Sequence, residues 1–234
     1  MVPTSQTILY PDSDGKPMAD NTRQFRWIVT LKENLEILFV DRADVFVAGD
    51  LLWYPVEGDN QTSHAPDAMV IFGRPKGDRG SYRQWQEDGI APQVVFEVLS
   101  PSNSRPEMAD KRDWYFRYGI EEYYQYDPDR NQLTGARRVD GRVVEIANML
   151  GWVSPRLGIR FELTAETLVV YAPNGDRFLT PVELAAERNQ ARDRAEQERA
   201  RAEQERARAD RAEAERAMLL DRLRALGIDP EQLQ

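Results

Sequence analysis

The chain has 234 residues, with 31 Lys plus Arg against 40 Asp plus Glu, one His and no Cys. Without cysteine it has no thiol nucleophile, no Cys-ligated zinc or iron–sulfur cluster, and no disulfide. Its single histidine excludes a metal site that is built from several histidines. The formal charge of −9 argues against nucleic-acid binding through bulk electrostatics, because neutralising phosphates requires clustered cations.

No apolar run approaches the roughly 18 residues of a membrane span, and the first 30 residues contain no signal-like apolar core. We therefore expect an unprocessed, cytoplasmic protein that does not enter membranes. All five Trp and all nine Tyr precede Pro181, where the composition changes sharply. We divide the chain into an N-terminal arm (1–19), a main domain (20–181), a charged helix (182–227) and a tail (228–234).

The first predicted element is a helix over 22–39, which Asn21 can cap. Apolar residues recur through it at helical spacing: Phe25, Ile28, Leu31, Leu35, Leu38 and Phe39. We expect these side chains to form the buried face of the helix.

Strand patterns follow, separated by a Gly-rich polar loop over 73–89 and by a second helix that Gly119 ends. In chain order we predict strands at 45–53, 68–72 and 94–99, a helix at 106–118, a strand at 122–126, and short β segments over 133–180 that close the far side. This order of elements predicts an α/β domain with a mixed sheet.

The segment Glu183–Arg224 consists almost entirely of Ala, Arg, Glu, Asp and Gln, with 11 acidic and 11 basic residues. The heptapeptide RAEQERA occurs twice in succession, from Arg194 and from Arg201. Strong helix formers and opposite charges one turn apart predict one long solvated helix, which Gly227 ends. Real apolar spacing occurs only at Leu219, Leu223 and Leu226, so a single exposed helix and a coiled-coil dimer are both compatible with it.

Two carboxylates stand out within the predicted sheet. Asp67 follows Pro66 at the start of one strand, and Glu97 lies among apolar neighbours in the middle of another. A buried carboxylate requires a partner or a bound cation. Two such acids from adjacent strands, with a backbone carbonyl such as that of Val98, form a hard oxygen site suited to Mg²⁺, with Mn²⁺ as an alternative. Lys111 could reach this site with a positive charge.

Three stretches carry a resemblance to a known family: PDAMVIF, VVFEVLSPSN and EMADKRDWYFRYGIEEYYQYDPD. Over roughly residues 20 to 170 the chain resembles the Uma-type restriction endonuclease family of the PD-(D/E)XK nuclease superfamily. The resemblance implies a restriction-endonuclease-like fold, in which helices flank a mixed central sheet, with the long charged helix added at the C-terminus. It further implies Asp67 and Glu97 as metal ligands and Mg²⁺-dependent hydrolysis of DNA.

One position departs from the superfamily motif, which has lysine two residues after Glu97, where this chain has Leu99. Lys111 is the candidate replacement, because it lies one helical turn from both Glu107 and Tyr115 on a face that can point at the strand ends. We assign it charge stabilisation and water activation.

Structural roles compete with these assignments. Asp67 fits a strand-entry turn, and Glu97 fits an internal ion pair with Lys111 or Arg112. Lys111 also fits an ordinary surface lysine of its helix. Further polar residues have open or structural roles. Ser100 fits a water bridge or a turn residue, Asp50 fits a third acid of the site or a solvent-facing residue, and His64 fits a loop residue. The cations of 73–80 fit a flexible loop or a DNA-contacting flap.

The function we predict is a metal-dependent DNA endonuclease that makes only local contacts with its substrate and assembles into a homo-oligomer. The same residues would serve a nuclease acting on RNA or branched DNA. The rival is a catalytically inactive nuclease fold that serves as an interaction scaffold through its C-terminal helix. The missing lysine, the negative charge and the charged helix all favour that rival.

Overall fold

The computed structural model describes residues 8–15 and 17–226. The chain divides into two compact units, Met1–Pro181 and Val182–Gln234. The first contains the sheet and its two covering helices, and the second contains the long helix. Each unit is described separately below.

A six-stranded mixed sheet forms the centre of the first unit, in the order β1-β3-β5-β6-β7-β8. Its strands are β1 (Val45–Ala48), β3 (Ala68–Phe72), β5 (Val94–Val98), β6 (Glu122–Asp127), β7 (Gln132–Val139) and β8 (Arg142–Glu145). Only β5 and β6 run parallel, and helix α2 (Arg105–Tyr118) connects them. The predicted class, a mixed sheet flanked by helices with a long C-terminal helix, is confirmed.

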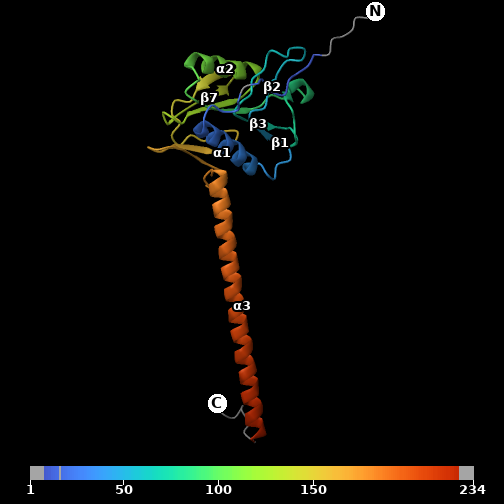
Figure 1. Ribbon diagram of the computed structural model, residues 1–234, viewed down its shortest axis with the longest axis vertical. Coiled ribbons are helices and arrows are strands. Elements are labelled where there is room, and N and C mark those ends of the chain that lie inside the picture. The colour runs from blue at the N-terminus through green and yellow to red at the C-terminus, as the bar shows by residue number, and fades with distance from the viewer. Residues whose placement is uncertain (1–7, 16, 227–234) are drawn as a thin grey trace, which may run out of the picture. The chain divides into compact units, whose positions relative to one another are not determined.

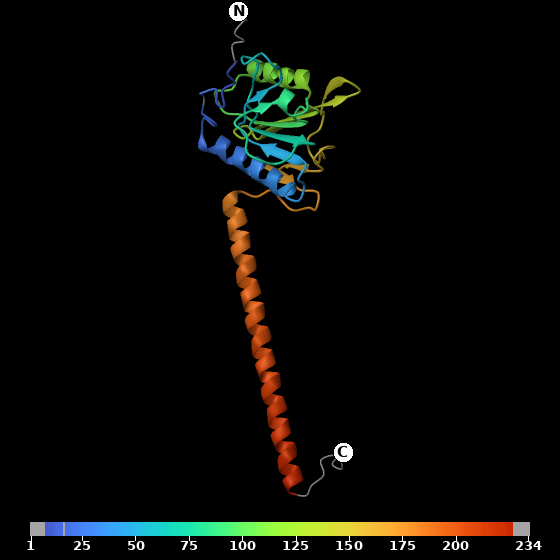
Figure 2. The ribbon, with the colours of Figure 1, turned by 90° about the vertical axis from the view of Figure 1, so that its right-hand side faces the viewer.

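Helices cover both faces of this sheet, as Figures 1 and 2 show. Helix α1 (Thr22–Leu38) packs Ile28 and Leu35 into one core, whereas α2 packs Tyr115 and Phe116 into the other. Alternate strand residues supply the two cores, because successive side chains of a strand point to opposite faces. The sheet therefore separates an α1 face from an α2 face.

The capping prediction for α1 is confirmed, but one of its predicted core positions is wrong. The side chain of Asn21 accepts hydrogen bonds from the backbone N–H groups of Arg23 and Gln24. Phe25 is 48% exposed, whereas its neighbour Gln24 is buried. Compared with the apolar face predicted from the sequence, the helix is rotated about its axis. Its first turn therefore buries the polar side chain of Gln24 in place of Phe25.

The single strand predicted over 45–53 is also wrong. The chain leaves the sheet after Ala48, and Asp50 adopts a left-handed backbone conformation with φ of 49°. A separate strand, β2 (Trp53–Tyr54), then pairs in parallel with β4 (Tyr82–Arg83). Because the strand ends before Asp50, the alternation of side chains between the two faces of the sheet does not extend to this residue.

The segment 73–89 is more ordered than predicted, since it contains β4 and the 3₁₀ helix η1 (Gln84–Gln86). Its cations are held by the protein itself. Arg74 and Arg79 both form ion pairs with Glu87, and Lys76 donates to the carbonyls of Phe39 and Val40. These contacts hold the segment in place, so it is not a loose loop, and its role as a DNA-contacting flap stays a prediction.

Helix α2 has sequence-encoded ends. Ser104 and Glu107 form a reciprocal capping box at its start, which satisfies two backbone donors. Gly119 follows its last turn with φ of 124°, and a Cβ there would lie 2.8 Å from the Cβ of Ala91. Only glycine fits both the backbone conformation and the close approach.

The last β elements of the unit form a hairpin, β9 (Arg160–Leu163) and β10 (Leu168–Tyr171). Phe161, Leu168 and Val170 from this hairpin join the core on the α1 face. Together with β7 and β8 they account for the short β segments predicted over 133–180.

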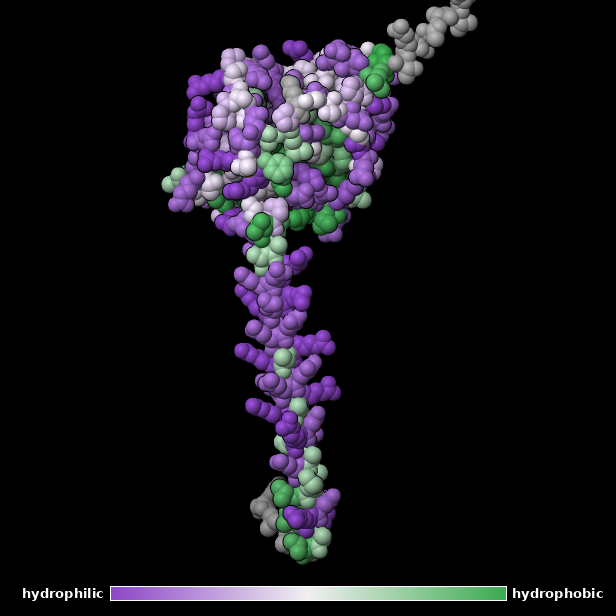
Figure 3. Space-filling view, in the orientation of Figure 1, coloured by the Kyte–Doolittle hydropathy of each residue, from purple (hydrophilic) through white to green (hydrophobic). Residues whose placement is uncertain are grey.

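The second unit is the helix α3 (Pro181–Ala225), which has no buried residue. Ion pairs one turn apart join Arg192 to Glu196 and Arg199 to Glu203 along its surface. Figure 3 shows mainly hydrophilic side chains along α3, with apolar ones gathered near its C-terminal end. The predicted stop at Gly227 and the tail 228–234 lie outside the described residues.

Candidate metal-binding and catalytic site

Asp67 and Glu97 lie opposite one another on the α2 face of the sheet. Strands β3 and β5 are antiparallel, with Ala68 paired to Phe96. One step beyond this pair the same register aligns Asp67 with Glu97, and directly opposed residues of an antiparallel pair share a face. Both side chains are buried, at 9% and 4% exposed. The fold thus brings together two acids that are 30 positions apart in the sequence.

The carboxylate of Asp67 is held by the backbone of β5. Its Oδ2 accepts a hydrogen bond of 2.6 Å from the N–H of Val98. Burial raises the pKa of Asp67 well above its ordinary value, and the nearby charge of Glu97 raises it further. Lys111 and the Val98 N–H oppose this increase without cancelling it. In the folded protein the ionised form of Asp67 is therefore disfavoured.

Each oxygen of the Glu97 carboxylate has its own donor on α2. Lys111 Nζ lies 2.8 Å from Oε2, and the hydroxyl of Tyr115 donates to Oε1 over 2.6 Å. Residues 111 and 115 are one helical turn apart, so both side chains reach β5 from the same side of α2. The ion pair that we considered as a structural alternative for Glu97 is thus present.

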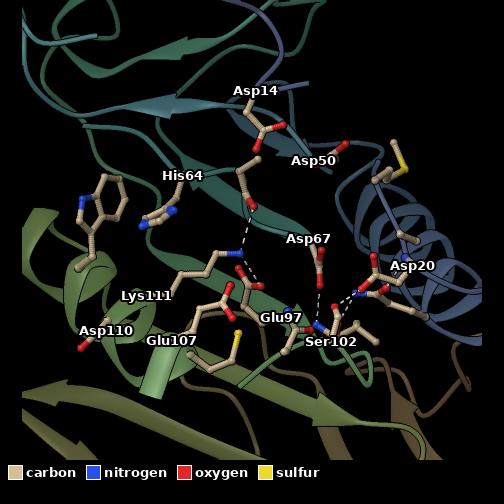
Figure 4. A pocket seen from close by; sticks show the side chains of 18 of the residues that line it. Asp14, Asp20, Asp50, His64, Asp67, Glu97, Ser102, Glu107, Asp110 and Lys111 are labelled. Atoms are coloured by element: carbon tan, nitrogen blue, oxygen red, sulfur yellow. Dashed lines mark hydrogen bonds and ion pairs between the residues drawn. The ribbon is translucent and has the colours of Figure 1, made fainter. Parts of the chain in front are cut away.

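The ammonium group of Lys111 lies between Glu97 and the backbone of the loop that precedes β3 (Figure 4). Its Nζ also lies 3.4 Å from the carbonyl oxygen of Ala65. Burial lowers the pKa of Lys111, but the charges of Glu97 and Asp67 outweigh burial and raise the pKa overall. The side chain is therefore an ammonium ion at neutral pH and holds its proton firmly.

The backbone of Val98 is engaged from both sides. Its N–H donates to Asp67, and its carbonyl oxygen accepts a 2.8 Å hydrogen bond from Nε2 of Gln24. Our sequence reasoning missed Gln24. The available signal was a polar residue four positions before Ile28, at the edge of the apolar stripe of α1.

These residues form the floor of a cleft of about 1160 Å³. Eight acidic side chains line it, against only Lys111 and Arg117 as cations; the acids are Asp14, Asp20, Asp50, Asp67, Glu97, Glu107, Asp110 and Asp113. Asp50 is one of them and is partly buried at the cleft wall, where it is placed to add a third acid beside Asp67 and Glu97. Burial raises the pKa of Asp50, as do the neighbouring charges of Asp14 and Glu97.

Two other singled-out residues border the same cleft or its rim. His64 lines the cleft and packs edge-on against Trp114, with ring centroids 4.7 Å apart. Ser100 is buried, and its hydroxyl donates to Asp20 over 2.5 Å. Ser100 therefore anchors the loop between β5 and α2 through a protein partner.

The donor set fits a hard divalent cation, because carboxylate and carbonyl oxygens are the ligands that Mg²⁺ prefers. Asp67 offers Oδ1, Glu97 offers the oxygen that Lys111 contacts, and the Val98 carbonyl has a second lone pair. Within residues 8–15 and 17–226, no cluster of three or more His, Cys, Asp or Glu side chains is close enough to bind one ion. A cation here would complete its coordination with water, as Mg²⁺ commonly does.

Comparison with protein families identifies the chain. The model of the family Uma2, described as "Putative restriction endonuclease", matches residues 14–167. This chain belongs to the Uma2 family. No curated protein matches this Uma2 chain.

One solved structure similar to the Uma2 chain is described as "a putative nuclease belonging to DUF820 from Anabaena variabilis ATCC 29413". The two share 17% sequence identity with a TM-score of 0.44, and the match covers 60% of this chain and 74% of the other. Within the described part of the Uma2 chain, no helix is long and apolar enough to cross a bilayer.

The matched residues of the Uma2 chain include the whole cleft floor. Asp67 and Glu97 both line this cleft, whereas Leu99, at the motif's lysine position, lies outside the residues that line it. The cation beside Glu97 comes instead from α2, through Lys111.

Proposed function

We propose that this chain is a metal-dependent endonuclease that hydrolyses phosphodiester bonds in DNA. Asp67, Glu97 and the carbonyl of Val98 would hold one Mg²⁺ or Mn²⁺ ion. The observation that supports the proposal is the opposition of two buried acids at a cleft floor, with the ammonium of Lys111 2.8 Å from one of them. Membership of a family described as restriction endonuclease supplies the reaction class.

A bound divalent ion would polarise the scissile phosphate and lower the pKa of its water. Lys111 would stabilise the negative charge that builds on the phosphate oxygens during attack by water. Because its pKa is raised, Lys111 holds its proton and is suited to charge stabilisation rather than to water activation as a base. Tyr115 and Val98 fix the orientation of the two carboxylates.

The acidic lining fits this requirement for metal. Eight carboxylic acids against two cations repel phosphate when no cation is bound. A divalent ion reverses the local charge where the phosphate must approach. Substrate binding in the cleft is therefore expected to depend on metal.

Plasmid cleavage tests the proposal directly. Purified protein with Mg²⁺ or Mn²⁺ is expected to nick or cut plasmid DNA, and Glu97→Gln is expected to lower the rate at least about 100-fold. Asp110→Asn is the matched control, because it removes an exposed acid that lines the same cleft without contacting the site. Equal cleavage by wild type and Glu97→Gln, or none by wild type on any DNA or RNA tested, would refute the assignment.

A nonenzymatic scaffold remains the second candidate, favoured by one observation. Both oxygens of Glu97 already have protein donors, as a purely structural ion pair would. Calorimetric titration separates the two. Mn²⁺ binding that is lost in Asp67→Ala supports the nuclease, whereas no binding at millimolar Mn²⁺ supports the scaffold.

A further inference from the structure

A second, smaller groove of about 420 Å³ lies along the other side of α2. Its walls come from the first half of α2, from β6 and β7, and from the segment that follows β8. Asn103 and Met108 line both this groove and the acidic cleft, so the two hollows adjoin at the start of α2.

Helix α2 separates charge between these two hollows. Glu107, Asp110 and Asp113, spaced three apart, line the acidic cleft, whereas Arg105 and Arg112 line the second groove. Residues seven apart lie on the same side of a helix, so the two guanidinium groups share one face. All three of these acids thus line the cleft, together with Lys111 and Arg117, whereas the part of α2 that lines the groove carries only the two arginines as charged residues.

A third arginine faces these two across the groove. Arg130 belongs to the turn between β6 and β7, and it lines the groove together with the amide side chains of Gln125 and Gln132. Only two acids line the same groove, Asp127 and Glu145. Its charge balance is thus positive, opposite to that of the neighbouring cleft.

The ion pairs in the groove are of a kind that a phosphate can replace. Arg112 Nη1 lies 3.1 Å from Glu145, whose side chain is 79% exposed, and its Nη2 lies 3.2 Å from Asp113, which is 64% exposed. Arg130 Nη1 lies 2.9 Å from the buried Asp127, and the exposed guanidinium has further N–H donors. Pairs with exposed partners contribute little to stability, whereas guanidinium groups bind phosphate through two parallel hydrogen bonds. Exchanging Glu145 for a phosphate therefore costs little.

We propose that this arginine groove, formed around Arg105, Arg112 and Arg130, binds a backbone phosphate of the DNA strand beside the phosphate that is cut. The proposal rests on the proposed nuclease function. A strand in the acidic cleft needs an anchor outside it, because the cleft repels every phosphate except one neutralised by metal. The groove adjoins the cleft at Asn103 and Met108, so it can provide that anchor next to the cleft.

Fluorescence anisotropy with a labelled 20-bp DNA duplex tests this in a background protein that keeps Asp67, Glu97 and Lys111, with Ca²⁺ in place of Mn²⁺ so that the metal ligands are intact and cleavage is avoided. Replacing Arg105 and Arg112 together by Ala is expected to raise Kd about 10-fold and to reduce the slope of log Kd against log salt by about 2. The control is Arg142→Ala, an exposed arginine of β8 outside the groove. Arg105→Ala alone, at an exposed first-turn position, is expected to reduce the slope by about 1.

The outcomes separate this proposal from the nuclease assignment. One outcome is that the background protein binds DNA while the double variant has the same Kd and salt slope as Arg142→Ala. Provided that circular dichroism shows the double variant to be folded, the groove is then not a phosphate site, and the nuclease assignment stands. If the double variant does not fold, the single variant decides in the same way. If the background protein binds no DNA at all, both proposals fail.

Discussion

The ammonium group of Lys111 lies 2.8 Å from the carboxylate of Glu97, so a helix residue supplies the cation that the superfamily motif places on the strand itself. A lysine on α2 can reach Glu97 as well as one on the strand can, because α2 packs directly over β5. The side chains of residues 111 and 115 both contact Glu97. Lysine at position 99 would lie two residues along the same strand face as Glu97. A lysine on α2 therefore reaches Glu97 with both acids in place.

Lys111→Met is expected to destabilise the protein by about 3 kcal/mol, because it leaves the buried Glu97 without its cation. Urea unfolding measures the change, and Lys111→Arg, which keeps the charge, is expected to recover part of it. A loss below about 0.5 kcal/mol for Lys111→Met would mean that Lys111 behaves as an ordinary surface lysine.

Tyr115→Phe removes the hydroxyl that donates to Glu97 Oε1 and keeps the ring, which stacks on Trp53 with centroids 6.1 Å apart. We expect a loss of about 1 to 3 kcal/mol, because one oxygen of a buried carboxylate loses its donor. Tyr118→Phe, on the last turn of the same helix, is the control. Equal unfolding free energies for the two variants would contradict the role given to the hydroxyl.

Asp67 makes stability depend on pH in a defined direction. Because burial and Glu97 raise its pKa in the folded state, folding is favoured while Asp67 is protonated. This contribution is complete below the ordinary pKa of about 4 and is lost as pH rises through the raised pKa. Without divalent metal, Asp67→Asn is therefore expected to be more stable than wild type at pH 8, with an advantage that shrinks toward pH 4.

Chemical denaturation in EDTA between pH 4 and 8 measures this difference, which can change by at most about 1.4 kcal/mol per pH unit. Asp110→Asn, at an exposed position, serves as the control and should show no such trend. Adding Mn²⁺ is expected to stabilise wild type but not Asp67→Asn. A constant difference across the pH range would contradict the assigned burial and repulsion.

The apolar end of α3 is the part of that helix suited to self-association, and we expect a homo-oligomer held there. Met218 and Leu219 are 67% and 61% exposed, and Leu223 lies one turn further on. Leu219→Arg with Leu223→Arg is expected to shift sedimentation equilibrium to the monomer. Ala195→Arg with Ala202→Arg, in the alanine-only heptads, is expected to leave the association unchanged; a monomeric wild type would contradict the expectation.

Elements with a clear period were predictable: α1, β3, β5 and α2 agree with their sequence patterns to within one or two residues. The acids Asp67 and Glu97 were also predictable as a pair, from a proline-led strand start and a charge among apolar neighbours. Gln24 was not, and Asp50 was only one of two alternatives, because their places at the cleft depend on which face α1 buries and on the left-handed backbone of Asp50 after β1. Neither the buried face of α1 at its first turn nor the end of β1 can be recognised from the spacing of apolar residues in the sequence.

The two hydrogen bonds to the Val98 peptide have a consequence for how the site is lost. They join the end of β5 to Gln24 in the first turn of α1 and to Asp67 just before β3. Fraying of that turn would release the carbonyl of Val98 before the sheet opens. Amide exchange at residues 24 to 28 is thus expected to slow when Mn²⁺ binds, since the ion would hold in place the same peptide that Gln24 secures.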